Sequence, residues 1–305
     1  MWRVSMNIPI PLYRLRSIAF LLILSVTVGC SARTLRDAQD HFNKGAEVEL
    51  RAMDRSLLSD NPVANPGDAF AALNEYRLAN SEADILIKNE SKALREENLL
   101  GAAFMLKAMS LWRISDLEGN SPVADEPSGA SRTVNGVINS RQELLTVLNR
   151  IEELQSNREI ALGTRDMVLH KALYGFYDHD GGRSENDYSK ARAWFQSAYK
   201  RLDEALAGND VPLRHPVRVY VGSAQLRTLA AWNLALYELR KDCSSNPDLP
   251  SCDLLNNDQK IINDETRQII CKLRPFYRNN VEVKNQLVQL LSPIGLPSVI
   301  NSPCP

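Results

Sequence analysis

The chain has 305 residues, and its 36 lysines and arginines nearly balance 37 aspartates and glutamates, for a formal net charge of −1. Nucleic-acid binding needs a basic face, and this balance argues against one. Hydrophobic residues make up 44% of the chain and aromatic residues only 7%, while alanine and leucine are frequent, a composition that favours packed helices.

The N-terminal segment has the features of a secretory signal. Arg14 and Arg16 precede an apolar run over residues 18–28, and Gly29 stands directly before Cys30. A basic stretch, a short apolar core and a small residue before the cleavage point define such signals. The eleven-residue run would rise about 16 Å as a helix, about half of the ~30 Å hydrocarbon core, so we expect no spanning helix.

Because a cysteine follows the small residue, the segment resembles a bacterial lipoprotein signal. The resemblance implies removal of residues 1–29 and attachment of a diacylglycerol to Cys30. Ser31, rather than aspartate, follows this cysteine, which in such proteins implies sorting to the outer membrane, on its periplasmic face. The removed segment contains three arginines and no acid, which leaves 33 basic against 37 acidic residues. A cleaved signal without lipid and an uncleaved anchor are the alternatives.

Apolar residues then recur at steps of three and four, the spacing of helices packed on a common core. The predicted helices cover approximately residues 34–57, 69–87, 92–114, 140–154, 158–177, 184–207, 216–241, 256–273 and 281–291. Thr34 and Ser140 each open a capping-box pattern, which predicts helix starts there. No alternating strand pattern is present, so the sequence predicts an all-α fold.

The predicted helices form one helical-repeat domain over residues 30–291, although the length admits either one elongated domain or two compact ones. It contains a long loop at residues 118–136 and is followed by a Pro-rich tail at residues 292–305. Taken in pairs, the helices start near residues 34, 92, 159 and 216, a spacing that indicates stacked antiparallel hairpins.

Three segments carry a small–aromatic–small pattern or its partner: Ala72-x₃-Tyr76-x₂-Ala79, Ala191-x₃-Phe195-x₂-Ala198 and Phe42-x₂-Gly45-Ala46. In these positions the chain resembles bacterial tetratricopeptide-repeat-like proteins, whose helices approach closely at such residues. The predicted helices are longer than that family's repeat, so we expect a tetratricopeptide-like α-solenoid or α–α superhelix. The resemblance implies an extended groove that binds a protein or peptide.

Four cysteines remain beyond Cys30, an even number in an oxidising compartment. They allow three pairings. We favour Cys243–Cys252, which encloses a Pro-rich loop, and this choice leaves Cys271–Cys304 to tie the tail to the last helices. Each bond would contribute about 2–4 kcal/mol. Their spacing is not that of zinc ligands, so we expect no metal site.

One polar cluster with possible ligand-binding residues surrounds a Gly-rich segment. His170 and His179 lie there together with Asp178. We favour a helix that stops at the glycines, followed by an Asp-rich turn with solvated side chains. A metal or ligand contact is the alternative.

A second candidate site lies at the start of the helix predicted from residue 216. Helix N-termini attract anions, and Arg214 and Arg218 would strengthen that attraction. Arg227 and Asn233 follow on the same helix. A peptide C-terminus or an acidic sugar is a suitable ligand, although core packing and solvated arginines explain the same residues.

No nucleophile elbow, metalloprotease, P-loop or haem-attachment motif occurs, so we assign no catalytic residue, no cofactor and no enzyme activity. The predicted function is a periplasm-facing lipoprotein, attached to the membrane through Cys30, that binds an envelope protein or peptide. Two alternatives remain open: a helical binder of a small hydrophobic solute, and a periplasmic hydrolase that uses the region of His170, Asp178 and His179.

Overall fold

The computed structural model describes residues 30–58, 66–120, 134–207, 216–278, 281–291, 300–301 and 304, and the predicted signal lies outside them. Over these residues the chain forms nine α-helices, one 3₁₀ helix at residues 250–254 and further 3₁₀ structure at residues 300–301, and it contains no strand, which confirms the all-α prediction. The chain consists of two compact units, the first ending at Asp166 and the second beginning at Met167. None of the described helices is both long enough and apolar enough to cross a membrane.

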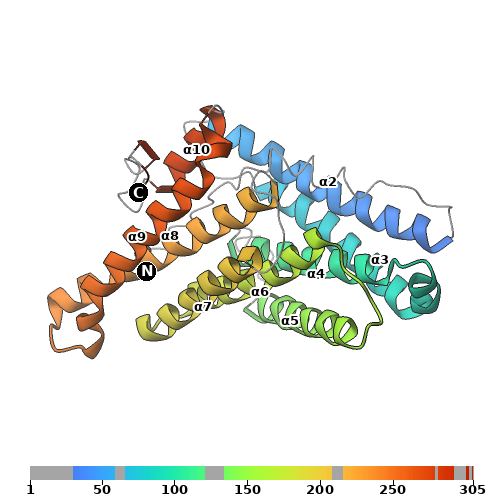
Figure 1. Ribbon diagram of the computed structural model, residues 1–305, viewed down its shortest axis with the longest axis horizontal. Helices are drawn as coiled ribbons and strands as arrows, with labels where there is room; N and C mark the ends of the chain where they lie inside the picture. Colours follow the sequence, from blue (N-terminus) through green and yellow to red (C-terminus); the bar gives the residue numbers. More distant parts are fainter. Residues whose placement is uncertain are drawn as a thin grey trace. The chain divides into compact units, whose positions relative to one another are not determined.

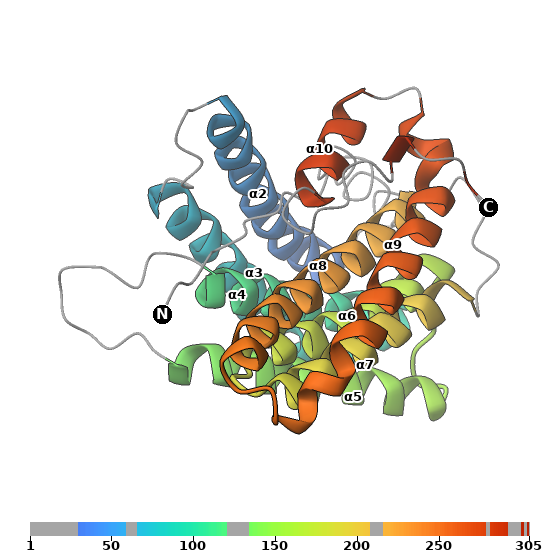
Figure 2. The same cartoon turned by 90° about the vertical axis from the view of Figure 1, so that its left-hand side faces the viewer.

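Within each unit, consecutive helices pack as antiparallel hairpins (Figures 1 and 2). The first unit contains α2 (Cys30–Leu58), α3 (Pro66–Glu96), α4 (Leu100–Asn120) and α5 (Val134–Ser156). The second begins within α6 (Thr164–Ser184) and contains α7 (Tyr188–Ala207), α8 (Pro216–Ser245), the 3₁₀ helix η3 (Pro250–Leu254), α9 (Leu255–Tyr277) and α10 (Val281–Leu291). Both α3 and α8 begin at a proline, which suits the first helical position because its missing N–H would have no partner there.

The α2–α3 hairpin is held by close packing around one tyrosine. The rings of Phe42 and Tyr76 lie with their centroids 5.2 Å apart. A Cβ atom on Gly45 would lie 2.9 Å from Cε1 of Tyr76, so only glycine lets the helices approach this closely. Ala72 and Ala79, on either side of Tyr76, are fully buried. The close approach expected from the small–aromatic–small pattern is therefore present in this hairpin.

The central helix of the first unit is α4, which packs against both α3 and α5 and is buried on several faces. A short turn joins it to α3, where Asn98 takes a left-handed conformation with φ 57° and the Leu99 N–H donates to the Leu94 carbonyl at 2.7 Å. The end of α5 is similar, with Arg158 at φ 58°. Both helices thus finish in a Schellman-type cap.

Glycines also set the contact between α6 and α7 in the second unit. A Cβ atom on Gly182 would lie 2.6 Å from Cε1 of Phe195, and one on Gly175 would lie 2.7 Å from Cγ of Leu202. The prediction that the helix stops at its glycines is wrong, because α6 continues past them with both glycines buried. These glycines serve close helix packing and do not form a cap.

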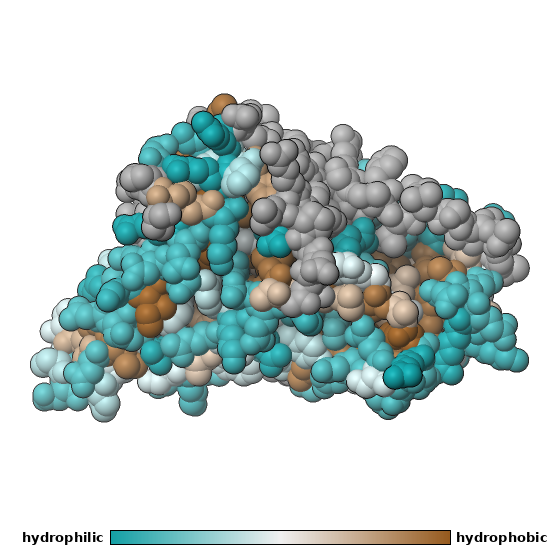
Figure 3. All heavy atoms as spheres, viewed as in Figure 1, coloured by the Kyte–Doolittle hydropathy of each residue, from teal (hydrophilic) through white to brown (hydrophobic). Residues whose placement is uncertain are grey.

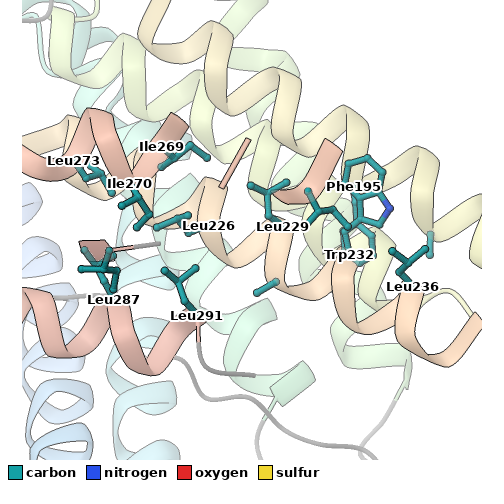
Figure 4. Close-up of a cluster of buried hydrophobic side chains, with 14 of the residues drawn as sticks. Phe195, Leu226, Leu229, Trp232, Leu236, Ile269, Ile270, Leu273, Leu287 and Leu291 are labelled. Carbon is teal, nitrogen blue, oxygen red and sulfur yellow. The ribbon is translucent and has the colours of Figure 1, made fainter. Parts of the chain in front are cut away.

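The hydrophobic core of the second unit is built around α8, which contacts α7, α9 and α10. Figure 4 shows the side chains that meet in this core: Phe195 of α7, Leu226, Leu229, Trp232 and Leu236 of α8, Ile269, Ile270 and Leu273 of α9, and Leu287 and Leu291 of α10. All of them are buried, and Trp232 is one of the largest fully enclosed side chains. The three predicted helices from residue 216 onward therefore share one core with α7.

Both predicted disulfides are present. The sulfur atoms of Cys243 and Cys252 are 2.01 Å apart and close the loop after α8. Those of Cys271 and Cys304 are 2.14 Å apart and join α9 to the C-terminal tail. Ile300, in the same tail, is buried, so the described part of the tail packs against the second unit.

Two helix starts and one loop differ from the predictions. Thr34 and Ser140 lie inside α2 and α5, so the starts inferred from their capping boxes are wrong. The hydroxyl of Ser140 donates to Oε2 of Glu118 on α4 at 3.2 Å, which shows that it serves packing between helices. The loop predicted at residues 118–136 is helical at both ends, because α4 and α5 extend into it, and residues 121–133 lie outside the described part.

The predicted separation of the helices at residues 69–87 and 92–114 is wrong as well. At this point α3 only kinks, at Glu90, whose φ of −124° and ψ of 18° depart from helical values. The chain reverses direction after Glu96, and α4 starts at Leu100. The polar residues before the kink resemble a helix end in the sequence, but helical hydrogen bonding resumes beyond them.

Candidate functional site

The predicted binding residues of α8 are not gathered at one point. Arg214 lies outside the described residues, and Arg218 and Arg227 are half-buried. Asn233 accepts a hydrogen bond from Nε2 of Gln259 on α9 at 3.0 Å, which ties the two helices together. Arg218 and Asn233 are about 22 Å apart along the helix axis, so these residues do not converge on one ligand.

The two predicted histidines of α6 are buried. Nδ1 of His179 lies 3.3 Å from the hydroxyl of Thr228 on α8. The ring of His170 meets that of Tyr174 edge-on, with centroids 5.4 Å apart. Both imidazoles therefore pack inside the second unit, where they contact protein groups.

Asp178 is also buried, so the prediction of solvated side chains around it is wrong. Its Oδ2 accepts hydrogen bonds from the Ser197 hydroxyl at 2.6 Å and from Nε of Arg201 at 2.7 Å, both on α7. A buried carboxylate needs such donors to offset its lost hydration. The carboxylate of Asp178 therefore links α6 to α7 through hydrogen bonds.

A second buried carboxylate joins three helices of the second unit. Asp258 of α9 is fully enclosed and accepts from Arg192 of α7 through two hydrogen bonds, of 2.6 and 2.9 Å. The hydroxyl of Tyr188 donates to Oδ2 of the same carboxylate at 2.7 Å and accepts from Nε1 of Trp232 on α8 at 3.1 Å. Burial and the hydrogen bond to Asp258 raise the pKa of Tyr188, which keeps this phenol a donor.

In the first unit, a comparable group of buried polar side chains links α2, α3 and α4. The guanidinium of Arg113 pairs with Glu49 and, at 2.7 Å, with Asp116, and it lies 4.7 Å from the ring of Trp112. The hydroxyl of Tyr76 donates to Glu49 at 2.5 Å, and burial together with that carboxylate raises the pKa of the phenol. Burial alone would lower the pKa of Arg113, but Glu49 and Asp116 outweigh it and raise the pKa. The arginine therefore stays charged.

One face of α3, its outer face, has side chains that point into solvent, unlike the buried polar groups that link the helices. We define this face by its exposed residues Ala71, Asn74, Leu78, Ser81, Ile85 and Lys88. Leu78 is 45% exposed and Ile85 is 53% exposed, although both are large apolar side chains. On the face drawn in Figure 3, hydrophilic residues predominate among the coloured atoms and apolar residues form smaller patches. A pair of them on one helix is a candidate contact surface.

Charged residues border the outer face of α3 on both sides. Toward α2, Nδ1 of His41 lies 2.6 Å from Glu75, and its Nε2 lies 3.5 Å from Glu82. On the other side, Arg77 donates to Glu118 of α4 at 2.8 Å. The exposed apolar residues therefore have carboxylates along one edge and a guanidinium along the other.

Leu78 and Ile85 were not among the residues predicted from the sequence as binding candidates. The buried residues of α3, among them Ala72, Tyr76 and Ala83, follow the apolar stripe expected from helical spacing. Leu78 and Ile85 fall outside that stripe, one heptad apart. Apolar residues on the wrong side of an otherwise well-patterned helix were the signal that could have identified them.

Within the described residues, no group of three or more His, Cys, Asp or Glu side chains is placed to hold a metal ion. Comparison with known proteins gives no matching family model, no matching curated protein and no matching solved structure.

Proposed function

We propose that the protein is a non-catalytic, lipid-anchored protein of the outer membrane that binds a protein or peptide on its periplasmic side. The outer face of α3 is the binding surface in this proposal. The observation that carries it is the exposure of Leu78 and Ile85 together on a helix whose opposite side is buried.

The packing around α3 supports this role. A binding surface is most effective on a rigid element, because little conformational entropy is then lost on association. Tyr76 anchors α3 to α2 and to the buried pair of Glu49 and Arg113. The polar groups that border the face are likewise bonded to neighbouring helices, so α3 presents its apolar residues from a fixed support.

The lipid anchor is tested by substituting its attachment site. We expect the natural protein to incorporate labelled palmitate and to fractionate with the outer membrane. The Cys30→Ala variant should remain unlabelled and keep its signal segment, since the acylated cysteine is missing. Labelling of the variant, or recovery of the natural protein in the soluble periplasmic fraction, would contradict the anchor.

Partner binding is tested by placing a photo-crosslinking amino acid at Ser81, between Leu78 and Ile85, in cells that carry a C-terminally tagged full chain. We expect one protein adduct in near-stoichiometric amount. The same probe at Lys44, exposed on α2, should give none. Equal adducts from both positions would contradict the assignment of the face.

A matched substitution separates binding from folding. Leu78→Ser together with Ile85→Ser should lower recovery of the partner at least fivefold, while the thermal unfolding midpoint stays within a few degrees because both residues are exposed. If the natural protein is purified alone and carries a bound small molecule by native mass spectrometry, it is a solute binder and the proposal fails.

A further inference from the structure

The exposed residues of α3 repeat with a seven-residue period. Ala71, Leu78 and Ile85 occupy one position of this repeat, and Asn74, Ser81 and Lys88 occupy the position three residues later. Alternating spacings of three and four residues form the seam through which two helices pack in a coiled coil. We infer that a second copy of this chain, with its α3 parallel to the first, occupies this face. The inference rests on the proposed function of α3 as a protein-binding surface.

The parallel orientation follows from the distribution of apolar residues along the seam. In a parallel pair each seam residue faces its own equivalent, so Leu78 meets Leu78 and Ile85 meets Ile85. In an antiparallel pair, the two seam positions face each other, and Leu78 would meet Ser81 while Ile85 would meet Asn74. Only the parallel pair joins the exposed apolar residues to one another and removes them from water together.

The charged residues at the edges of the face also favour a parallel pair. In a parallel heptad pair, the residue before one seam position meets the residue five places later in the other helix, so Arg77 faces Glu82 of the second copy. Two-fold symmetry repeats this contact. An antiparallel pair that brings Leu78 opposite Ser81 would place Glu75 against Glu82 of the second copy, a pair of like charges. It would also bring Arg77 opposite Asp84, but Lys88 and Lys107 already pair with that carboxylate. The edge charges are therefore self-complementary in the parallel orientation.

Arg77 and Glu82 have capacity for a further contact. Their side chains are 43% and 32% exposed. Within one copy, Oε1 of Glu82 lies 3.5 Å from Nε2 of His41, whereas Oε2 is enclosed and has no hydrogen-bond partner among the described residues. The partial exposure of Arg77 and Glu82 leaves both charges open to a surface ion pair with the second copy, which adds to the pairing of the apolar residues.

The position of the lipid anchor is consistent with a parallel pair. Because α2 runs antiparallel to α3, its first residue, Cys30, lies at the end of the hairpin where α3 finishes (Figure 1). Two copies anchored in the same membrane would present these ends on the same side. This is the orientation that a parallel α3 pair needs, and membrane confinement raises the effective concentration of the two faces.

The seam is short, which sets the expected strength of the pair. Beyond Ile85, Lys88 and Lys92 would each face the same charge in the second copy, and the kink at Glu90 ends the straight part of the helix. Asn74 and Ser81 add polar layers that lower stability. We therefore expect a dimer in the membrane and a monomer in dilute detergent solution.

Cysteine crosslinking in native membranes tests the seam directly. Leu78→Cys and Ile85→Cys, each in the full chain, should form disulfide-linked dimers after mild oxidation, with at least five times the yield of Lys44→Cys on α2. Thermal unfolding of each variant checks its fold. Yields no higher than that of Lys44→Cys would overturn the proposal. So would a mixed disulfide between Leu78→Cys and Ser81→Cys chains that exceeds both homodimers, because it indicates an antiparallel pair.

A charge swap in the Leu78→Cys background tests the predicted ion pair. Arg77→Glu and Glu82→Arg should each lower the dimer yield at least threefold, and the double variant should restore it, because the opposite charges again face each other. Glu118→Gln is the control, since it removes the negative charge that Arg77 contacts within one copy but keeps Arg77 and Glu82 at the seam. Failure of the double variant to recover the yield would overturn the assigned contact.

The outcome also separates this inference from the proposed function. If Ser81 crosslinks to a different envelope protein and no homodimer forms, α3 binds a protein but the second-copy inference is wrong. If the adduct is a second copy, both stand. If neither adduct forms, both fail.

Discussion

At the scale of single residues, the buried carboxylate of Asp258 makes the clearest contribution to stability. It has no exposed surface and receives three hydrogen bonds from Arg192 and Tyr188. Asp258→Asn removes the charge, and we expect a loss of about 2–4 kcal/mol in the free energy of unfolding, because Arg192 then loses its buried partner. Urea unfolding measures this loss. Glu238→Gln, in the exposed pair with Lys241, should cost far less because solvent screens that pair, and equal losses would contradict the role of burial.

The lowered pKa of Asp84 predicts how the free energy of unfolding depends on pH. Burial alone would raise its pKa, but hydrogen bonds from Lys107 at 2.5 Å and from Lys88 outweigh burial, and the pKa lies below its ordinary value of 3.8. A depressed carboxyl pKa stabilises the fold at a pH above the unfolded value and loses that contribution as pH falls through the folded value. The stability difference between the natural protein and Asp84→Asn should therefore be present at pH 7 and shrink below about pH 4. Urea unfolding at pH 7, 4 and 3 measures it, and a constant difference would contradict the ion pair.

At the scale of elements, Gly182 makes the contact between α6 and α7 possible. Gly182→Ala would place its Cβ 2.6 Å from the Phe195 ring, which is itself enclosed and cannot easily move. We expect a loss of about 1–3 kcal/mol. Gly163→Ala is the matched control, because nothing lies within 4 Å of its Cβ, and it should be neutral or slightly stabilising. Equal unfolding free energies for the two variants would show that the helices do not meet at Gly182.

Most helices could be predicted from the sequence because each buries one stripe of apolar residues. In α5, for example, apolar residues at helical spacing such as Leu144 and Ile151 are buried. Helix ends were predicted less well, because a local signal does not reveal what another helix supplies. The glycines of α6 have the composition of a cap, and only the approach of α7 gives them their role. Thr34 and Ser140 likewise fit capping boxes, yet lie inside longer helices.

The candidate site was harder to predict than the fold. The residues predicted to bind a ligand, such as His179 and Asn233, are polar, and polar groups are common in binding sites. In the structure, His179 contacts Thr228 and Asn233 bonds to Gln259, so both side chains link neighbouring helices. The outer face of α3 could not be identified in the same way. Which side of α3 is exposed depends on how the other helices pack against it, and the sequence alone does not reveal that packing.

At the scale of the whole molecule, the two units should differ in their sensitivity to reducing agents. Both bonds lie in the second unit, which begins at Met167. In the chain-entropy description, closing the 33-residue separation between Cys271 and Cys304 restricts the unfolded chain by about 3–4 kcal/mol. The first unit has no such bond among its described residues and relies on packing and on the tie at Arg113.

Reduction should therefore weaken one unit selectively. After treatment with a reductant under native conditions, we expect amide hydrogen exchange to accelerate in α8, α9 and α10, while α2 to α4 keep their protection. Cys271→Ser with Cys304→Ser should reproduce most of this effect, since that bond fixes the tail to α9. Cys243→Ser with Cys252→Ser should have a smaller effect, because its separation is only 9 residues and its loop is largely exposed. Hydrogen exchange followed by mass spectrometry resolves the helices separately. Equal acceleration in both units would mean that they unfold as one cooperative body, and the independence of the two parts would be wrong.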